Sequence, residues 1–246
     1  MDLSNNEVLI TGGGSGIGLG LAGKFRDAGS RVIVCGRRRE VLEDAKKKHP
    51  GLVTYPCDLT SEPERARFAQ MIVHDHPQLN VLVNNAGIQQ RMGLDQKDFW
   101  PRAKQETSIN WEAPLHLTYL LLETLKKAQR AFIINVTSGL AFVPLAAAPI
   151  YCATKAAFHS FTRALRQLLV DTKVQVIEII PPGVNTDLGG PGLHTTGTPL
   201  EEFIGAVAQQ LKEGSLEISY GFSEKMSRAS REELEEAFRR MNGSRP

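Results

Sequence analysis

The chain has 246 residues, and its 29 Lys and Arg side chains against 27 Asp and Glu give a formal net charge of +2 at neutral pH. A hydrophobic fraction of 41% excludes an intrinsically disordered chain. The balanced charge argues against binding to nucleic acid or to an anionic membrane, because such proteins concentrate basic residues on one face. At this length a single domain over residues 1–246 is expected.

The sequence predicts a cytoplasmic protein. Its strongly apolar run at 140–150 is far shorter than the roughly 20 residues that a membrane span needs. The N-terminus shows neither the basic nor the apolar region of an export signal. Cys35, Cys57 and Cys152 lie in unrelated contexts without C-x-x-C spacing, so we expect reduced thiols rather than disulfides or a metal site.

Short segments rich in β-branched residues alternate with longer helical patterns along the first 180 residues. Alternation of this kind predicts an α/β protein with a parallel sheet between two helical layers, the doubly wound Rossmann-type fold. Several of the segments are apolar throughout, as expected of parallel strands covered on both faces. Strands are predicted at 7–11, 31–35, 52–56, 80–84, 131–137 and 174–180, and helices at 17–28, 38–48, 62–76, 106–127 and 151–171.

The last quarter of the chain departs from this alternation. Residues 182–199 contain five glycines and three prolines, and long loops in compact domains usually cover binding sites. We therefore expect a substrate loop or lid at 184–215. A short strand is expected at 218–220. Within the charged C-terminal segment 223–246, Ser230 and Glu233 form a capping-box pattern that predicts the start of a helix.

A glycine-rich run, T-G-G-G-S-G-I-G at residues 11–18, joins the first predicted strand to the first predicted helix. Glycines at such a turn let a pyrophosphate approach the backbone N–H groups at a helix N-terminus. A plain glycine-rich turn is the alternative, but this position is the one that a dinucleotide-binding site requires. The residues predicted to bind the dinucleotide here are Gly12, Gly14, Ser15, Gly16, Ile17 and Gly18.

Tyr151 and Lys155 form a candidate acid–base pair. They are four residues apart on a predicted helix, so their side chains share one face. A neighbouring ammonium favours the phenolate and lowers the tyrosine pKa from its usual value of about 10. Ser138, at the end of the fifth predicted strand, can donate a hydrogen bond to a substrate oxygen. Each residue alone can be structural, but together they suit hydride transfer between a nicotinamide and a carbonyl carbon.

The end of the second predicted strand bears on cofactor choice. NAD sites place an acidic residue about 20 residues past the glycine motif, whereas NADP sites replace it and add an arginine for the 2′-phosphate. Here that place is Gly36, and Arg37, Arg38 and Arg39 follow. Arg39 can simply begin a solvated helix. We expect NADP(H) to be preferred over NAD(H), with Arg37 as the main phosphate contact and Arg38 as the second.

These motifs occur in the order and spacing of one known family. The T-G-x-x-x-G-x-G run, Asn84-Asn85-Ala86-Gly87, Asn110, Ser138, Tyr151-x-x-x-Lys155 and Pro182-Gly183 resemble those of the short-chain dehydrogenase/reductases of similar length. The resemblance implies an oxidoreductase in which Tyr151 is the general acid and base and Ser138 polarises the carbonyl. It also implies that Lys155 holds the nicotinamide ribose and that Asn110 lies at a helix irregularity supporting a proton relay.

The resemblance also implies the remaining cofactor contacts and an assembly. Members of the family often form dimers or tetramers through the helices that correspond to those carrying Asn110 and Tyr151, so a homodimer or homotetramer is expected. The cofactor contacts are Asp58 and Leu59 at the adenine, Asn85, Ala86 and Gly87 at the ribose, and Pro182, Gly183 and Thr186 at the carboxamide.

The substrate is constrained only loosely by the sequence. Apolar residues after Ser138, including Leu140 and Leu145, either line a pocket wall or belong to the core, and the wall interpretation favours an apolar carbonyl compound or secondary alcohol. A catalytically idle nucleotide-sensing protein on the same fold is the main alternative, although such a protein should lack part of the Ser, Tyr and Lys set. A sugar-nucleotide epimerase or dehydratase is a third option, but it usually has a larger C-terminal domain.

Overall fold

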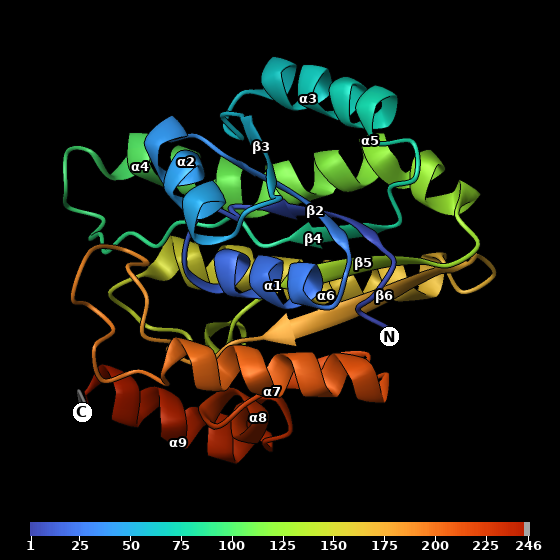
Figure 1. Ribbon diagram of the computed structural model, residues 1–246. Helices are drawn as coiled ribbons and strands as arrows, with labels where there is room; N and C mark the ends of the chain where they lie inside the picture. The colour runs from blue at the N-terminus through green and yellow to red at the C-terminus, as the bar shows by residue number, and fades with distance from the viewer. Residues whose placement is uncertain (244–246) are drawn as a thin grey trace.

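The computed structural model describes residues 1–243, which form an α/β structure around one parallel sheet (Figure 1). The strand order is β3-β2-β1-β4-β5-β6-β7, so the predicted doubly wound Rossmann-type fold is confirmed. The order reverses between β1 and β4, and ligands of such sheets bind beyond the carboxyl ends of the strands at this point. The strands are β1 (Glu7–Thr11), β2 (Arg31–Gly36), β3 (Val53–Pro56), β4 (Val81–Asn84), β5 (Ala131–Val136), β6 (Val174–Ile180) and β7 (Glu217–Ser219).

Two hydrophobic cores explain why the strands are apolar on both faces. In β1, Val8 and Ile10 pack under α1 (Gly16–Asp27), α2 (Arg39–Lys48) and α7 (Leu200–Glu213). The intervening residue Leu9 packs on the opposite face, under α3 (Glu62–Asp75), α5 (Ala113–Lys127) and α6 (Pro149–Leu168). Successive strand residues point to opposite faces, so a strand buried between two helical layers needs apolar residues at every position.

The helix predicted at 106–127 differs from the structure at its beginning. Helix α4 begins at Phe99 and ends at Thr107, and a π-helical turn over Ser108–Glu112 joins it to α5. The turn contains Asn110, so a helix irregularity does occur at this residue. A π-helical turn inserts one residue into the helix, and such insertions are frequent at functional sites.

The segment predicted as a substrate loop, 184–215, is a loop only over its first half. From Leu200 to Glu213 it forms α7, whose apolar face packs in the core against α1 through Phe203 and Ile204. The C-terminal segment forms α8 (Phe222–Ser227) and α9 (Arg231–Asn242), which are seen below α7 in Figure 1. Residues 244–246 of the predicted segment 223–246 lie outside the described residues. Among residues 1–243, no helix has the length and apolar character needed to cross a membrane.

Candidate active site

The glycine-rich turn between β1 and α1 packs so closely against its surroundings that Gly12 and Gly18 leave no room for a side chain. Gly12 adopts a left-handed conformation with φ of +64°, and a Cβ there would lie 2.9 Å from the Cα of Ala86. A Cβ on Gly18 would lie 2.5 Å from the carbonyl oxygen of Gly12. Helix α1 begins at Gly16, so its first N–H groups have no partners within the helix and can bind an anion. The turn therefore fits the pyrophosphate of a dinucleotide.

Thr11 and Asn85 fasten this turn to the end of β4. The Thr11 Oγ1 accepts hydrogen bonds from the backbone N–H groups of Asn85 and Ala86, each at 3.0 Å. The Asn85 side-chain amide donates to the carbonyl oxygens of Thr11 at 2.9 Å and Gly12 at 3.3 Å. The Asn85 side chain thus supports the glycine turn. Thr11, which the sequence interpretation left out of the site, is the residue that joins the two loops.

Ser138, Tyr151 and Lys155 come together at the carboxyl end of β5. Tyr151 and Lys155 lie on one face of α6, and their side chains are 5% and 4% exposed. The Lys155 ammonium donates a hydrogen bond to the carbonyl oxygen of Val136 at 2.8 Å and lies 5.7 Å from the centre of the Tyr151 ring. The structure therefore assembles a hydroxyl, a phenol and an amine in one buried cluster.

Burial dominates the electrostatics of this cluster. Burial raises the pKa of the Tyr151 phenol, and the influence that opposes burial is a hydrogen bond from Ser138 rather than the charge of Lys155. Burial also lowers the pKa of Lys155 to about 8. That the Lys155 ammonium favours the Tyr151 phenolate stays a prediction for the protein with its cofactor bound. Desolvation disfavours the charged form of both groups, and helical spacing does not reveal it.

Asn110 is buried beneath the same cluster and binds the segment that follows β4. Its Oδ1 accepts from the backbone N–H of Ile88 at 2.9 Å, and its Nδ2 donates to the carbonyl oxygen of Ile88 at 2.9 Å. A second donation from Nδ2 reaches the hydroxyl of Thr154 on α6 at 3.3 Å. A Cβ on Gly87 would lie 3.3 Å from the Asn110 Oδ1 and 3.6 Å from the Lys155 Nζ. Gly87 therefore lies against both Asn110 and Lys155.

Two arginines, and no acidic residue, follow Gly36 at the end of β2. Arg37 and Arg38 are exposed, and neither forms an ion pair with any residue in the described part of the chain. A Cβ on Gly14 would lie 3.0 Å from Val41, so the first turn of α2 packs directly against the glycine turn. Both arginines thus lie in the short segment between β2 and this first turn of α2.

The other predicted contacts lie around the same edge of the sheet. Asp58 Oδ1 accepts from both the backbone N–H and the hydroxyl of Thr60, while the Leu59 side chain is buried in the core. On the opposite side, the loop after Pro182 and Gly183 brings Thr186 to 3.5 Å from the position of a Cβ on Gly16. The loop after β6 therefore reaches the glycine turn, whereas Asp58 and Leu59 follow β3 at the same edge of the sheet.

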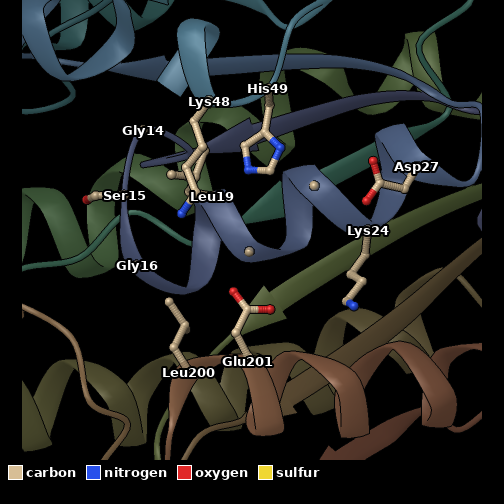
Figure 2. A pocket seen from close by; sticks show the side chains of 12 residues that line it. Gly14, Ser15, Gly16, Leu19, Lys24, Asp27, Lys48, His49, Leu200 and Glu201 are labelled. Atoms are coloured by element: carbon tan, nitrogen blue, oxygen red, sulfur yellow. The ribbon is translucent and has the colours of Figure 1, made fainter. Parts of the chain in front are cut away.

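A groove of about 240 Å³ begins at the glycine turn and runs along the outer face of α1 (Figure 2). Lys48 and His49 lie on one side of α1 in this view, and Leu200 and Glu201 lie on the other. The groove contains Gly14, Ser15 and Gly16 but none of Ser138, Tyr151 and Lys155. It therefore adjoins the glycine turn and is separate from the cluster of Ser138, Tyr151 and Lys155.

A second cavity, of about 320 Å³, lies between the segment after Ser138, α6 and α9, and its lining is almost entirely apolar. Phe238 of α9 closes one side. Asn242 ties the end of α9 to the same segment, because its Nδ2 donates to the carbonyl oxygen of Pro144 at 3.0 Å and its Oδ1 accepts from the N–H of Ala146 at 2.7 Å. The sequence did not predict this contact between the C-terminal helix and the segment after Ser138.

A glycine turn at a helix N-terminus, a strand-order reversal and a buried Ser, Tyr and Lys cluster define a dinucleotide-binding oxidoreductase of the α/β class. Comparison with known proteins agrees. A sequence profile described as short chain dehydrogenase matches residues 6–195. The chain belongs to the short-chain dehydrogenase family, and it is an NAD(P)-dependent oxidoreductase.

Relatives match nearly the whole chain. The uncharacterized oxidoreductase DltE of Bacillus subtilis is 42% identical over 98% of both chains. Among solved structures, a short chain dehydrogenase from Burkholderia cenocepacia in complex with NADP has a TM-score of 0.84 and 27% identity, covering 97% of this chain and 99% of that one. The RhlG/NADP active-site complex of Pseudomonas aeruginosa has a TM-score of 0.79 and 25% identity, covering 90% and 98%.

Proposed function

We propose that this oxidoreductase interconverts a small carbonyl compound and the corresponding secondary alcohol, with NADP(H) preferred over NAD(H). The observation that carries the proposal is the buried cluster of Ser138, Tyr151 and Lys155 at the carboxyl end of β5. A phenol in this position can exchange a proton with a substrate oxygen, as general acid and base catalysis requires.

The chain's own residues have separate roles in this proposal. A bound nicotinamide supplies or takes up hydride at the substrate carbon. Ser138 donates a hydrogen bond to the substrate oxygen, and Tyr151 gives that oxygen a proton in reduction or removes it in oxidation. Lys155 holds the ribose and favours the phenolate against the effect of burial. Asn110 keeps Ile88 and the π-helical turn in place beside Lys155, where a proton relay to solvent begins.

The preference for NADP(H) is supported by Arg37 and Arg38. Both are exposed beside the glycine turn, and Gly36 provides no carboxylate for a free ribose hydroxyl. An arginine binds phosphate through two parallel hydrogen bonds. The relatives from Burkholderia cenocepacia and Pseudomonas aeruginosa were both solved with NADP.

We also propose a homodimer or homotetramer formed through α5 and α6, and a cytoplasmic location. Tyr119 on α5 and Leu168 on α6 are 76% and 74% exposed, which leaves apolar surface on both helices for a second copy. All three cysteines are buried free thiols, as suits a reducing compartment. Light scattering after size exclusion measures the assembly directly.

The activity is tested with a panel of apolar carbonyl compounds, by following the loss of NADPH absorbance. Consumption of NADPH with formation of the matching alcohol supports the proposal. The alternative of a nucleotide-sensing protein predicts tight NADPH binding with no turnover on the panel or on the corresponding alcohols with NADP⁺.

A further inference from the structure

Glu106, in the last turn of α4, is a wholly buried carboxylate that the proposed mechanism does not use. Its exposed fraction is 0%. Oε1 accepts a hydrogen bond from the backbone N–H of Gln90 at 3.0 Å. Oε2 is also buried, and it has no hydrogen-bond partner among residues 1–243. Since a buried charge needs compensation from its surroundings, the position of Glu106 requires an explanation.

The backbone contacts place Glu106 beside the candidate active site. Glu106 binds the N–H of Gln90, and Asn110, four residues later, binds the N–H of Ile88. The two side chains thus hold alternate residues of the extended segment after β4. Asn110 also reaches Thr154 on α6, one residue from Lys155. Helix α4, which carries Glu106, packs against α6, which carries Tyr151 and Lys155.

The groups that act on Glu106 electrostatically come from two helices. Arg102 lies on its own helix, but its guanidinium also donates to the Gln90 Oε1 at 2.8 Å and to the carbonyl oxygen of Arg91 at 2.9 Å. On α6, Lys155 interacts favourably with the Glu106 carboxylate. The negative charge of Glu106 raises the pKa of Tyr151 and of Cys152. Lys155 forms no ion pair within 4 Å in the described chain.

The effect between Glu106 and Lys155 is reciprocal. Burial raises the pKa of Glu106 to about 7, and Lys155 opposes this rise. Burial lowers the pKa of Lys155 to about 8, and Glu106 is the carboxylate that opposes this fall. Removing either charge leaves the other with less compensation for its burial. Without Glu106, Lys155 would lose its proton at a lower pH.

We propose that Glu106 is a positioning residue for the reaction and acts as the buried counter-charge that keeps the Lys155 ammonium charged inside the site. Its value to catalysis depends on the proposed function, because it acts through Lys155 on Tyr151. The charge relationship itself belongs to the cofactor-free protein and can be measured there.

Glu106→Gln separates this role from a structural one. A glutamine keeps the volume and a carbonyl oxygen that can accept from Gln90 N–H, but it carries no charge. Glu106→Ala removes the charge and the hydrogen bond together. Glu123→Gln is the matched control, because it removes one negative charge from the exposed face of α5.

The test is a ¹³C NMR titration of cofactor-free protein labelled at the lysine ε-carbons and the glutamate carboxyls. The Lys155 and Glu106 signals are assigned by their loss in Lys155→Met and Glu106→Gln. We expect the titration of Lys155 to move to lower pH by about half a unit or more in Glu106→Gln and to stay unchanged in Glu123→Gln. An unchanged Lys155 titration in Glu106→Gln would overturn the proposal.

The reciprocal measurement follows the Glu106 carboxyl, whose signal is assigned by its loss in Glu106→Gln or, where that variant does not fold, in Glu106→Ala. In Lys155→Met the Glu106 carboxyl should titrate at higher pH than in the unmodified protein, because the favourable charge is gone. A Glu106 titration that is the same in both proteins would also overturn the proposal. Neither titration needs substrate. A protein without activity would therefore refute the proposed function but would leave the test of the charge interaction between Glu106 and Lys155 intact.

An activity measurement then assesses the link to catalysis. Glu106→Gln should shift the pH profile of kcat/KM with NADPH while leaving the Kd of NADPH at low pH within about threefold. If Glu106→Gln has the unmodified pH profile and only Glu106→Ala is impaired, the residue acts solely by holding Gln90, and the positioning role is refuted.

Discussion

Asn110 binds both backbone polar groups of Ile88, accepting from its N–H and donating to its carbonyl oxygen, each at 2.9 Å. The paired bonds join the π-helical turn to the segment beside Gly87. Asn110→Ala removes both, and we expect it to lower the free energy of unfolding by about 1–3 kcal/mol and turnover by about tenfold or more. Urea unfolding and steady-state kinetics measure the two effects. Unimpaired turnover in this variant would show that the Ile88 segment does not depend on Asn110.

Arg37 provides a test of cofactor preference. Arg37→Asp should reduce kcat/KM with NADPH by roughly 10- to 150-fold, since a hydrogen bond between charged groups contributes about 1.5–3 kcal/mol. The value with NADH should change little or rise. Arg39→Asp, in the first turn of α2, is the control for a general change of surface charge and should have a much smaller effect. Equal losses of kcat/KM with NADPH and NADH in Arg37→Asp would contradict the proposal that Arg37 binds the 2′-phosphate.

Glu106 should make stability depend on pH. Its pKa is about 7 in the folded protein, above its ordinary value of 4.5, so the folded protein binds more protons than the unfolded chain between these values. Its contribution to stability is therefore present below about pH 4.5 and is lost as the pH rises through 7. Glu106→Gln cannot ionise, so it should gain roughly 1–3 kcal/mol relative to the unmodified protein between pH 4.5 and 8. A constant difference in unfolding free energy across this range would contradict the assignment.

The C-terminal helix should affect substrate binding more than cofactor binding. No α9 residue is buried, and Asn242 anchors the helix to Pro144 and Ala146, which follow Ser138 in the chain. Asn242→Ala removes the hydrogen bonds that hold α9 against Pro144 and Ala146. We expect KM for an apolar carbonyl substrate to rise severalfold while KM for NADPH stays unchanged. Arg239→Gln, on the exposed part of α9, is the control. Equal changes in both KM values would show that α9 does not act on the substrate wall specifically.

Much of the fold could be predicted because its signals are local. Alternating apolar strands and amphipathic helices indicate a parallel sheet, and the carboxyl ends of parallel strands lie at one edge, so Gly12 and Ser138 lie at the same edge of the sheet although they are far apart in sequence. Helix α7 was missed despite a clear signal. Phe203, Ile204, Val207 and Leu211 recur at helical spacing, but the glycines and prolines before them favoured an extended loop.

The electrostatics of the site could not be predicted in the same way. The pKa of a phenol depends on how deeply the folded chain buries it, and the spacing of Tyr151 and Lys155 contains no information on that depth. Glu106 has no distinctive sequence signal either. It looks like an ordinary helix residue until the structure shows it fully buried, with Oε1 bound to the Gln90 N–H and Oε2 without a partner in the described chain. The role of Asn242 likewise depends on a contact made 98 residues away in the chain.

The central claim is that Tyr151 transfers the proton, and the most direct test compares NADPH binding with turnover in Tyr151→Phe. The substitution removes one hydroxyl and keeps the buried ring, so we expect the Kd of NADPH to stay within about threefold while kcat falls by about a hundredfold or more. Turnover at the unmodified rate in Tyr151→Phe would contradict the claim.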